Sequence, residues 1–222
     1  MHETPFIDIH THHSYPKEGV RSIVNYFPEQ ITLEDHFDTY ISLGLHPWHL
    51  DKDSADENFE TLTTFASNDK VLAIGEIGLD RTVATPLNIQ ESYFTKQIAI
   101  AESLNKPIII HCVRCYPELL SLKKEVKAST PWLIHGFRNN SQIAKDLLQQ
   151  NFYISFGEAL LFDQKIQDVF VEMPINQIFL ETDESHYSIS EIYNKAAQLK
   201  SIQLTELKKD LWDSFKAVFH AK

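Results

Sequence analysis

The stretch PFIDIHTH, residues 5–12, ends a short apolar run on two histidines, and four later runs end in the same manner. They read VLAIGE (71–76), PIIIH (107–111), WLIH (132–135) and IFLETD (178–183). Each run is rich in β-branched or aromatic residues, as a buried strand is, yet each finishes on an imidazole or a carboxylate. Parallel α/β barrels carry their active sites at the carboxyl ends of their strands. The recurrence therefore predicts a parallel barrel with a metal centre on that rim.

The remaining pattern alternates strands with helices, which is typical of βαβ units and a parallel sheet. Eight strands are predicted, so the expected fold class is α/β, a (β/α)8 TIM-like barrel. The predicted strands are Phe6–His10, Ser22–Tyr26, Thr39–Leu45, Val71–Glu76, Pro107–His111, Trp132–His135, Phe152–Phe156 and Ile178–Glu181. The predicted helices are Ala55–Ser67, Leu87–Ser103, Tyr116–Ala128, Asn140–Gln150, Asp163–Met173, Ser188–Leu199 and Thr205–His220.

The front of this barrel is short of chain. The segment between His10 and Ser22 is too short for a full crossover unit with its helix, which needs about a dozen residues or more. The segment between Phe27 and Asp38 is short as well. We therefore expect a barrel that is trimmed or distorted around its first two βα units. No linker or repeat divides the sequence, which predicts a single domain over residues 1–222.

Composition limits the possible functions. No window is long and apolar enough for a transmembrane helix, and residues 1–13 lack the features of a signal peptide, so we expect a cytoplasmic protein. The net charge of −11 argues against a protein that coats duplex nucleic acid with a broad basic face. A nuclease stays possible, because bound divalent ions can supply positive charge locally.

The two cysteines, Cys112 and Cys115, form a CxxC motif directly after His111. A redox or zinc site is one interpretation of this spacing. A lone CxxC lacks the second pair that a tetrahedral zinc site needs, and its strand context is unlike that of thioredoxin. We favour reduced thiols packed near His111.

The six residues at the strand ends form the candidate metal-ligand set: four imidazoles and two carboxylates, enough for two metal ions. Any one of the histidines could be an ordinary buried side chain, but the ordered set favours ligands. Glu181 competes with Asp183 as the ligand of the last strand and is expected on its opposite side or behind it. Imidazole with carboxylate suits Zn²⁺ or Mn²⁺ and is a poorer match to Mg²⁺. The set is His10, His12, Glu76, His111, His135 and Asp183.

The chain resembles the TatD family of metal-dependent hydrolases, within the amidohydrolase-like barrel superfamily. The matching stretches run from residue 7 to about residue 187, and GEIGLD and ETD are the most specific. They read IDIHTHH, GLHPWH, AIGEIGLD, IIIHCVR, LIHGF, YISFGEALLF and FLETDES.

The resemblance implies a ligand assignment and an activity. One ion would be held by His10, His12, Glu76 and Asp183, and the second by Glu76, His111 and His135. It also implies a deoxyribonuclease, often of the 3′-to-5′ exonuclease type, with single-stranded DNA or another phosphodiester as substrate. Other family members act on other substrates.

The sequence departs from the family at the rim. Arg81 stands where the family has an aromatic residue after GLD. After His111 the family has a close Arg-Asp pair, whereas this sequence reads Val113-Arg114-Cys115, with the arginine shifted by one position and no acidic residue. Three of the four arginines, Arg81, Arg114 and Arg138, thus follow rim motifs. Guanidinium groups bind phosphate oxygens in bidentate fashion. We expect these three to bind substrate phosphate, although ordinary surface pairing is an equal alternative.

His46 and His49, in GLHPWH, are expected at the rim of the third strand, where His46 would orient substrate; packing roles are equally open. The expected reaction is hydrolysis by a metal-activated water, with Asp183 as the catalytic base that orients the water. Two alternatives stay open: an amide or ester hydrolase on the same barrel, and a non-catalytic protein in which metal serves folding.

Overall fold

The computed structural model describes residues 3–14, 17–32, 36–50 and 54–221. Eight strands form one sheet, and they lie side by side in the same order in which they follow one another along the chain. The neighbours β1–β2, β3–β4, β4–β5 and β7–β8 pair in parallel. Every predicted strand is present. The strands are β1 Phe6–Thr11, β2 Val20–Tyr26, β3 Tyr40–Leu43, β4 Val71–Asp80, β5 Ile108–Val113, β6 Trp132–Ile134, β7 Phe152–Phe156 and β8 Ile178–Leu180.

The chain divides into two compact units. Unit 1 comprises Met1–Val24 and Ile134–Lys222, and unit 2 comprises Asn25–Leu133. Unit 1 is therefore built from the two ends of the sequence. The single domain expected over residues 1–222 stays a prediction.

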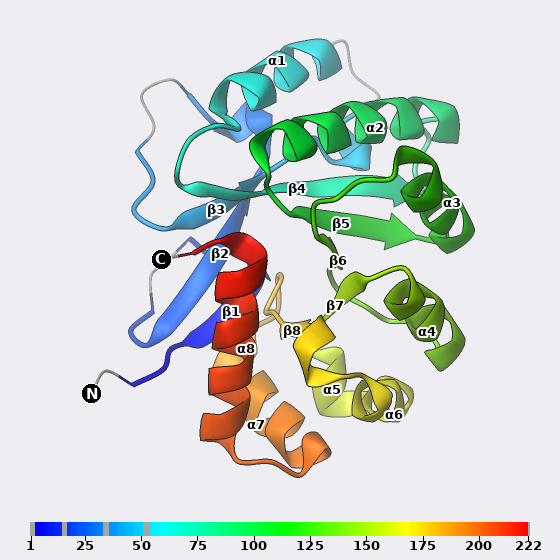
Figure 1. Cartoon of the computed structure of the whole chain (residues 1–222). Coiled ribbons are helices and arrows are strands. Elements are labelled where there is room, and N and C mark those ends of the chain that lie inside the picture. The colour runs from blue at the N-terminus through cyan, green and yellow to red at the C-terminus, as the bar shows by residue number, and fades with distance from the viewer. Residues whose placement is uncertain (1–2, 15–16, 33–35, 51–53, 222) are drawn as a thin grey trace. The chain divides into compact units, whose positions relative to one another are not determined.

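Unit 1 joins the first strand to the last. Thr11 in β1 forms a parallel bridge with Asp183, just beyond β8. Helix α8 packs against β1, and α7 packs against both (orange and red in Figure 1). The apolar side chains of Leu207, Leu211, Phe215 and Val218 form one buried face of α8, which explains why this amphipathic segment covers the strand. The helices of unit 1 are α4 Ser141–Gln149, α5 Ala159–Phe162, α6 Gln164–Glu172, α7 Ile189–Lys200 and α8 Leu204–Phe219, with the 3-10 helix η3 at Ile175–Gln177.

Unit 2 is centred on β4, which pairs with β3 and β5 and packs against α2 (green in Figure 1). Two buried glutamines of α2 reach back to the strands. Gln97 binds the backbone N–H and C=O of Leu45 at 2.7 and 3.1 Å, and Gln90 binds those of Asp80 at 2.7 and 2.9 Å. These contacts fix the ends of β3 and β4, where site residues follow. The helices are α1 Ala55–Phe65, α2 Leu87–Leu104 and α3 Tyr116–Val126, with 3-10 helices η1 Pro28–Gln30 and η2 Pro47–His49.

The trimmed front of the barrel is present as expected. Between β1 and β2 the described residues contain no helix, and between β2 and β3 they contain only η1. The first α-helix of the chain, α1, follows β3. In the described part of these two connections, α-helices are thus absent where the sequence is too short to form a crossover helix.

Strands β4 and β5 continue at least two residues beyond their predicted ends. β4 continues four residues beyond Glu76 to Asp80, and β5 continues two residues beyond His111 to Val113. The apolar run marks only the first part of β4, whereas the pairing Ile77↔Ile110 through Asp80↔Val113 carries both strands further. Glu76 consequently lies within its strand, and Asp80 stands on the same face two alternations later.

Among the described residues, no helix has the length and apolar character needed to cross a membrane. The cytoplasmic location stays a prediction. Both cysteines are free thiols, with Cys115 buried and Cys112 half-buried. Burial raises the pKa of Cys115 to about 11, which fits reduced thiols that are not reactive.

Candidate metal centre

In unit 1, Asp183 is attached to the end of β1 through its backbone. Its N–H donates to the carbonyl of His10 at 2.9 Å, and its carbonyl accepts from the N–H of His12 at 3.2 Å. Asp183 has a φ of 54°, a conformation that aspartate and asparagine tolerate better than most residues. The loop after β8 therefore presents this carboxylate to the two histidines of β1.

The side chains of unit 1 converge at distances suited to a shared ion. Asp183 Oδ1 lies 3.7 Å from His10 Nε2 and 3.6 Å from His12 Nε2. The His10 and His135 rings are 4.3 Å apart, and one ligand atom each of His10, His135 and Asp183 lies within 4.8 Å of the others. The carboxylate–imidazole distances exceed a hydrogen bond, whereas ligands about 2.0–2.2 Å from one ion lie at such separations. This set of imidazoles and a carboxylate fits a Zn²⁺ or Mn²⁺ ion.

Glu181 supports this cluster from behind. Its carboxylate accepts a 2.6 Å hydrogen bond from the N–H of Gly136 and lies 3.4 Å from His135 Nδ1. Burial would raise the pKa of Glu181, but His135 and His10 lower it overall. Gly136 has a φ of 56°, which glycine adopts without strain. Glu181 thus lies behind His135, in the position from which a carboxylate can orient a metal-binding histidine. Its role relative to the candidate ligands stays a prediction.

In unit 2, His111 lies between two carboxylates. Its Nδ1 is 2.8 Å from Glu76 Oε1, and its Nε2 is 3.0 Å from Asp80 Oδ2. His46 Nε2 approaches the same Glu76 oxygen at 3.2 Å. His46, Glu76 and His111 therefore form a second group of potential ligands, all largely buried.

Asp80 is a site residue that the sequence interpretation missed. It accepts hydrogen bonds from Trp48 Nε1 at 2.8 Å and from the Thr82 N–H at 2.7 Å. Burial would raise the pKa of Asp80, but the hydrogen bonds from Thr82, Trp48 and His111 lower it to about 2. The ionised carboxylate can accept the Nε2 proton of His111 and leave Nδ1 facing Glu76. The signal was present in GEIGLD, where Glu76 and Asp80 are four residues apart on one strand.

Gly78 lets β4 pass His111. A Cβ atom on Gly78 would lie 2.0 Å from the His111 carbonyl oxygen. No side chain fits there, so glycine is required between Glu76 and Asp80 for the strand to hold both carboxylates against His111.

The three predicted phosphate-binding arginines are exposed. Arg81 pairs with Glu118 and donates from Nε to the Arg114 carbonyl at 3.0 Å. Arg138 pairs with Glu158 at 3.1 Å. His46, predicted to orient substrate, lies beside Glu76, and His49 pairs with Glu29 at 2.7 Å. The substrate-binding roles stay predictions.

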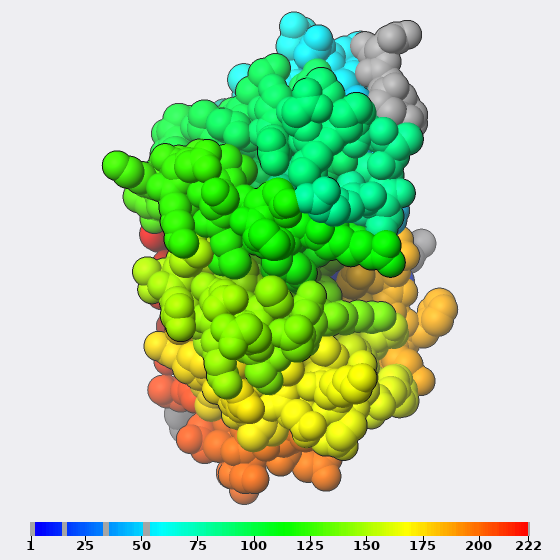
Figure 2. Space-filling view, turned by 90° about the vertical axis from the view of Figure 1, so that its right-hand side faces the viewer, coloured from blue at the N-terminus to red at the C-terminus, as the bar shows by residue number. Residues whose placement is uncertain are grey.

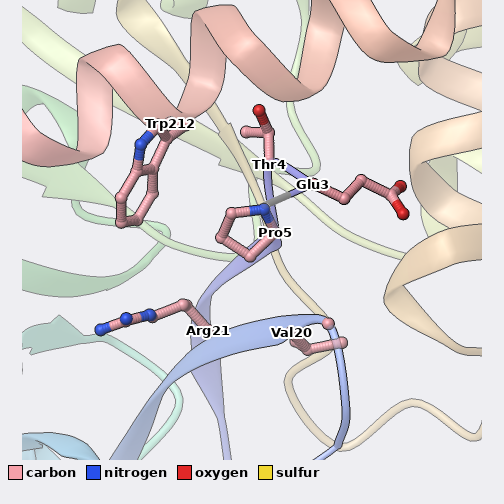
Figure 3. Close-up of a pocket in the computed structure, with 7 residues that line it drawn as sticks. Glu3, Thr4, Pro5, Val20, Arg21 and Trp212 are labelled. Carbon is pink, nitrogen blue, oxygen red and sulfur yellow. The ribbon is translucent and has the colours of Figure 1, made fainter. Parts of the chain in front are cut away.

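A hollow of about 510 Å³ lies at the amino-terminal ends of β1 and β2, away from the carboxyl ends that carry the candidate ligands (Figure 3). Its lining includes Glu3, Arg21 and Trp212. The Arg21 guanidinium lies 5.8 Å from the centroid of the Trp212 ring, and Glu3 forms an ion pair with Lys208. The hollow borders the start of β1 and β2, whereas His10 and Asp183 stand at the carboxyl ends. Catalytic groups of such barrels collect at the carboxyl ends, so the histidine–aspartate cluster is the candidate site.

Comparisons with known proteins identify the family of the chain. The family model described as TatD related DNase matches residues 20–220. The uncharacterized metal-dependent hydrolase YabD of Bacillus subtilis is 33% identical over 156 residues, which span 68% of this chain and 60% of that protein. The uncharacterized metal-dependent hydrolase YjjV of Escherichia coli is 28% identical over 204 residues, or 80% of this chain and 78% of that protein.

Solved structures confirm the fold class. The crystal structure of YjjV, a TatD homologue from Escherichia coli, superposes with a TM-score of 0.85 at 25% identity and covers 98% of both chains. A TatD family hydrolase from Entamoeba histolytica has the same fold, with a TM-score of 0.79 at 17% identity and 98% of both chains covered. By the family match over nearly its whole length, the chain belongs to the TatD family of metal-dependent hydrolases.

Proposed function

We propose that this chain is a metal-dependent phosphodiesterase that degrades single-stranded DNA from its 3′ end. The observation that carries the proposal is the convergence of His10, His12 and His135 on the half-exposed Asp183 carboxylate. The family match, TatD related DNase, supports a nucleic acid as the substrate class.

We assign two divalent metal ions, each Zn²⁺, Mn²⁺ or Mg²⁺, to the carboxyl-terminal rim of the barrel. His10, His12, Glu76 and Asp183 would hold one, and Glu76, His111 and His135 the other, with Glu76 shared. Support comes from the fold class, because the carboxyl ends of the strands in a (β/α)8 barrel gather at one rim. The 3.2 Å contact with Glu76 adds His46 as a candidate ligand or orienting residue.

When bound, the ions would supply positive charge for a phosphoryl oxygen and lower the pKa of water at the site. Asp183 is suited to orient this water and accept its proton, because its side chain is 42% exposed. Glu76 is 6% exposed and close to two imidazoles, so it is suited to binding ions and not to receiving a proton. The base and the bridging ligand are thereby separate residues.

Arg81, Arg114 and Arg138 would bind substrate phosphates. Arg138 is 63% exposed and its partner Glu158 is 38% exposed. Exposed ion pairs contribute about 0–1 kcal/mol, so a phosphate can displace Glu158 from the guanidinium at little cost.

The test is a substrate panel with metal-stripped protein to which Zn²⁺, Mn²⁺ or Mg²⁺ is returned. We expect metal-dependent, stepwise shortening of 5′-labelled single-stranded DNA from its 3′ end, and no turnover of amide or carboxylic-ester substrates. Turnover of amides or esters alone would establish the alternative hydrolase. No turnover of any substrate, with loss of the fold on metal removal, would establish a structural role for the metal.

A further inference from the structure

Two large aromatic side chains are exposed together in unit 1. Phe162, the last residue of α5, is 66% exposed, and Tyr187, before α7, is 39% exposed. Their ring centroids are 5.1 Å apart, with the planes tilted by 55°. Aromatic side chains gain most from burial, so two exposed rings in contact are a candidate surface for binding another molecule. In Figure 2 the region of α5 and α6 is coloured yellow and the region of α7 orange.

Hydrogen bonds fix the backbone of Tyr187 near the loop that carries Asp183. It follows Asp183 by four residues, which span at most about 14 Å when extended. Its N–H donates to Ser185 Oγ at 3.1 Å, and Ser185 Oγ donates to Glu158 at 2.8 Å. The N–H of Ser185 also donates to the Thr182 carbonyl at 2.9 Å. The backbone of Tyr187 is thus held within about 14 Å of Asp183, and the Phe162 ring packs against the Tyr187 ring.

The same carboxylate links the pair to a cation. Glu158 accepts from Ser185 on one oxygen and from Arg138 on the other, at 3.1 Å. Hydrogen bonds from Ser185 and Arg138 lower the pKa of Glu158. A metal-ligand candidate, a guanidinium and two exposed rings are therefore connected within one unit.

Aromatic rings beside a cation are the elements with which proteins bind single-stranded nucleic acid. Rings stack on the bases, and cations contact the phosphates. We propose that Phe162 and Tyr187 form a stacking platform for a base of the substrate, within a few nucleotides of the cleaved bond. This inference rests on the proposed nuclease function and adds the residues that bind the base.

The platform makes binding depend on bases without depending on sequence, because every base has a stacking face. An oligonucleotide that lacks bases near its 3′ end should bind weakly although its phosphates are intact. Removal of the rings should weaken binding of the normal oligonucleotide and leave the abasic one unchanged. This pairing separates stacking from phosphate binding.

The experiment measures fluorescence anisotropy of 5′-labelled dT12 with the Asp183→Asn protein and the divalent ion that supports hydrolysis by wild type. A matched oligonucleotide carries abasic residues at its 3′ end. We expect Phe162→Ala and Tyr187→Ala to raise the Kd for dT12 about 5- to 100-fold and that for the abasic strand less than 2-fold. Tyr187→Phe, which keeps the ring, should bind like the parent, as should Val171→Ala, a change at another exposed apolar residue of unit 1.

Equal loss for the two oligonucleotides, or no loss for either, would overturn the platform. The same alanine changes in active enzyme should raise KM for DNA with little change in kcat. If wild type fails to hydrolyse DNA with any metal, the proposed function fails and the platform fails with it. If wild type hydrolyses DNA and the alanine variants keep the KM for dT12, only the platform fails.

Discussion

The Asp183 N–H donates a 2.9 Å hydrogen bond to the His10 carbonyl, and the side chains of the same two residues approach each other to 3.7 Å. The backbone contact links β1 to the chain beyond β8, so the pairing of these two segments also brings the His10 and Asp183 side chains together. The geometry of the candidate site therefore depends on the pairing between the first and last strands.

Replacing Asp80 with Asn should weaken metal binding while the fold is kept. The change removes the charged acceptor beside His111 Nε2, and loss of such partners typically costs about 10- to 100-fold in metal affinity or activity. Isothermal titration of the metal-stripped protein with Zn²⁺ or Mn²⁺ measures the effect. An unchanged Kd would show that Asp80 does not orient His111.

Gly78→Ala should destabilise the fold strongly, since its Cβ would overlap the His111 carbonyl. We expect a loss of roughly 3 kcal/mol or more in the free energy of unfolding. The control is Gly19→Ala, where φ is +74° and no atom lies within 4 Å of the added Cβ; about 1–2 kcal/mol is expected there. Urea denaturation compares the two, and equal losses would contradict the steric argument.

Glu102 should give the fold a pH dependence in the acid range. It accepts hydrogen bonds from the Ser129 and Thr130 N–H groups at 3.1 and 2.7 Å. Burial would raise the pKa of Glu102, but the bonds from Thr130 and Ser129 lower it to about 2. Because the folded pKa lies below the unfolded one, this stabilisation is complete above about pH 5 and is lost as the pH falls toward 2.

Glu102→Gln should therefore destabilise the protein by about 1 kcal/mol at pH 7. The difference from wild type should shrink below pH 4.5 and disappear near pH 2. Urea titrations across this range measure it, with Glu60→Gln on the exposed face of α1 as the control. A difference that stays constant down to pH 2 would exclude the charge as its cause.

Metal binding should raise the thermal stability of the metal-stripped protein. An ion at 100 times its Kd stabilises the folded state by about 2.7 kcal/mol, which corresponds to a Tm increase of roughly 5–10 °C for a chain of this size. Differential scanning calorimetry with and without Zn²⁺ or Mn²⁺ measures the shift. No shift with any divalent ion would contradict a metal centre.

The candidate ligands could be picked out from the sequence because each ends an apolar run, and hydrophobic periodicity is a local signal. Their binding of metal stays a prediction. Asp80 was not found because β4 extends past Glu76 only through its pairing with β5, which is a long-range contact. The role of Glu181 depends likewise on the N–H of Gly136, 45 residues earlier. The place of His46 beside Glu76 could not be read from GLHPWH, because η2 sets its direction.

The central claim is that Asp183 receives the proton of the attacking water. Asparagine tolerates the φ of 54° at this position, so Asp183→Asn removes the base and preserves the loop. The measurement is single-turnover cleavage of 5′-labelled single-stranded DNA by metal-loaded wild type and Asp183→Asn, with the oligonucleotide Kd measured in parallel. We predict a rate about 10²- to 10⁴-fold lower with the Kd for DNA within a few-fold of wild type. A variant that cleaves at the wild-type rate with its metal bound would contradict the account.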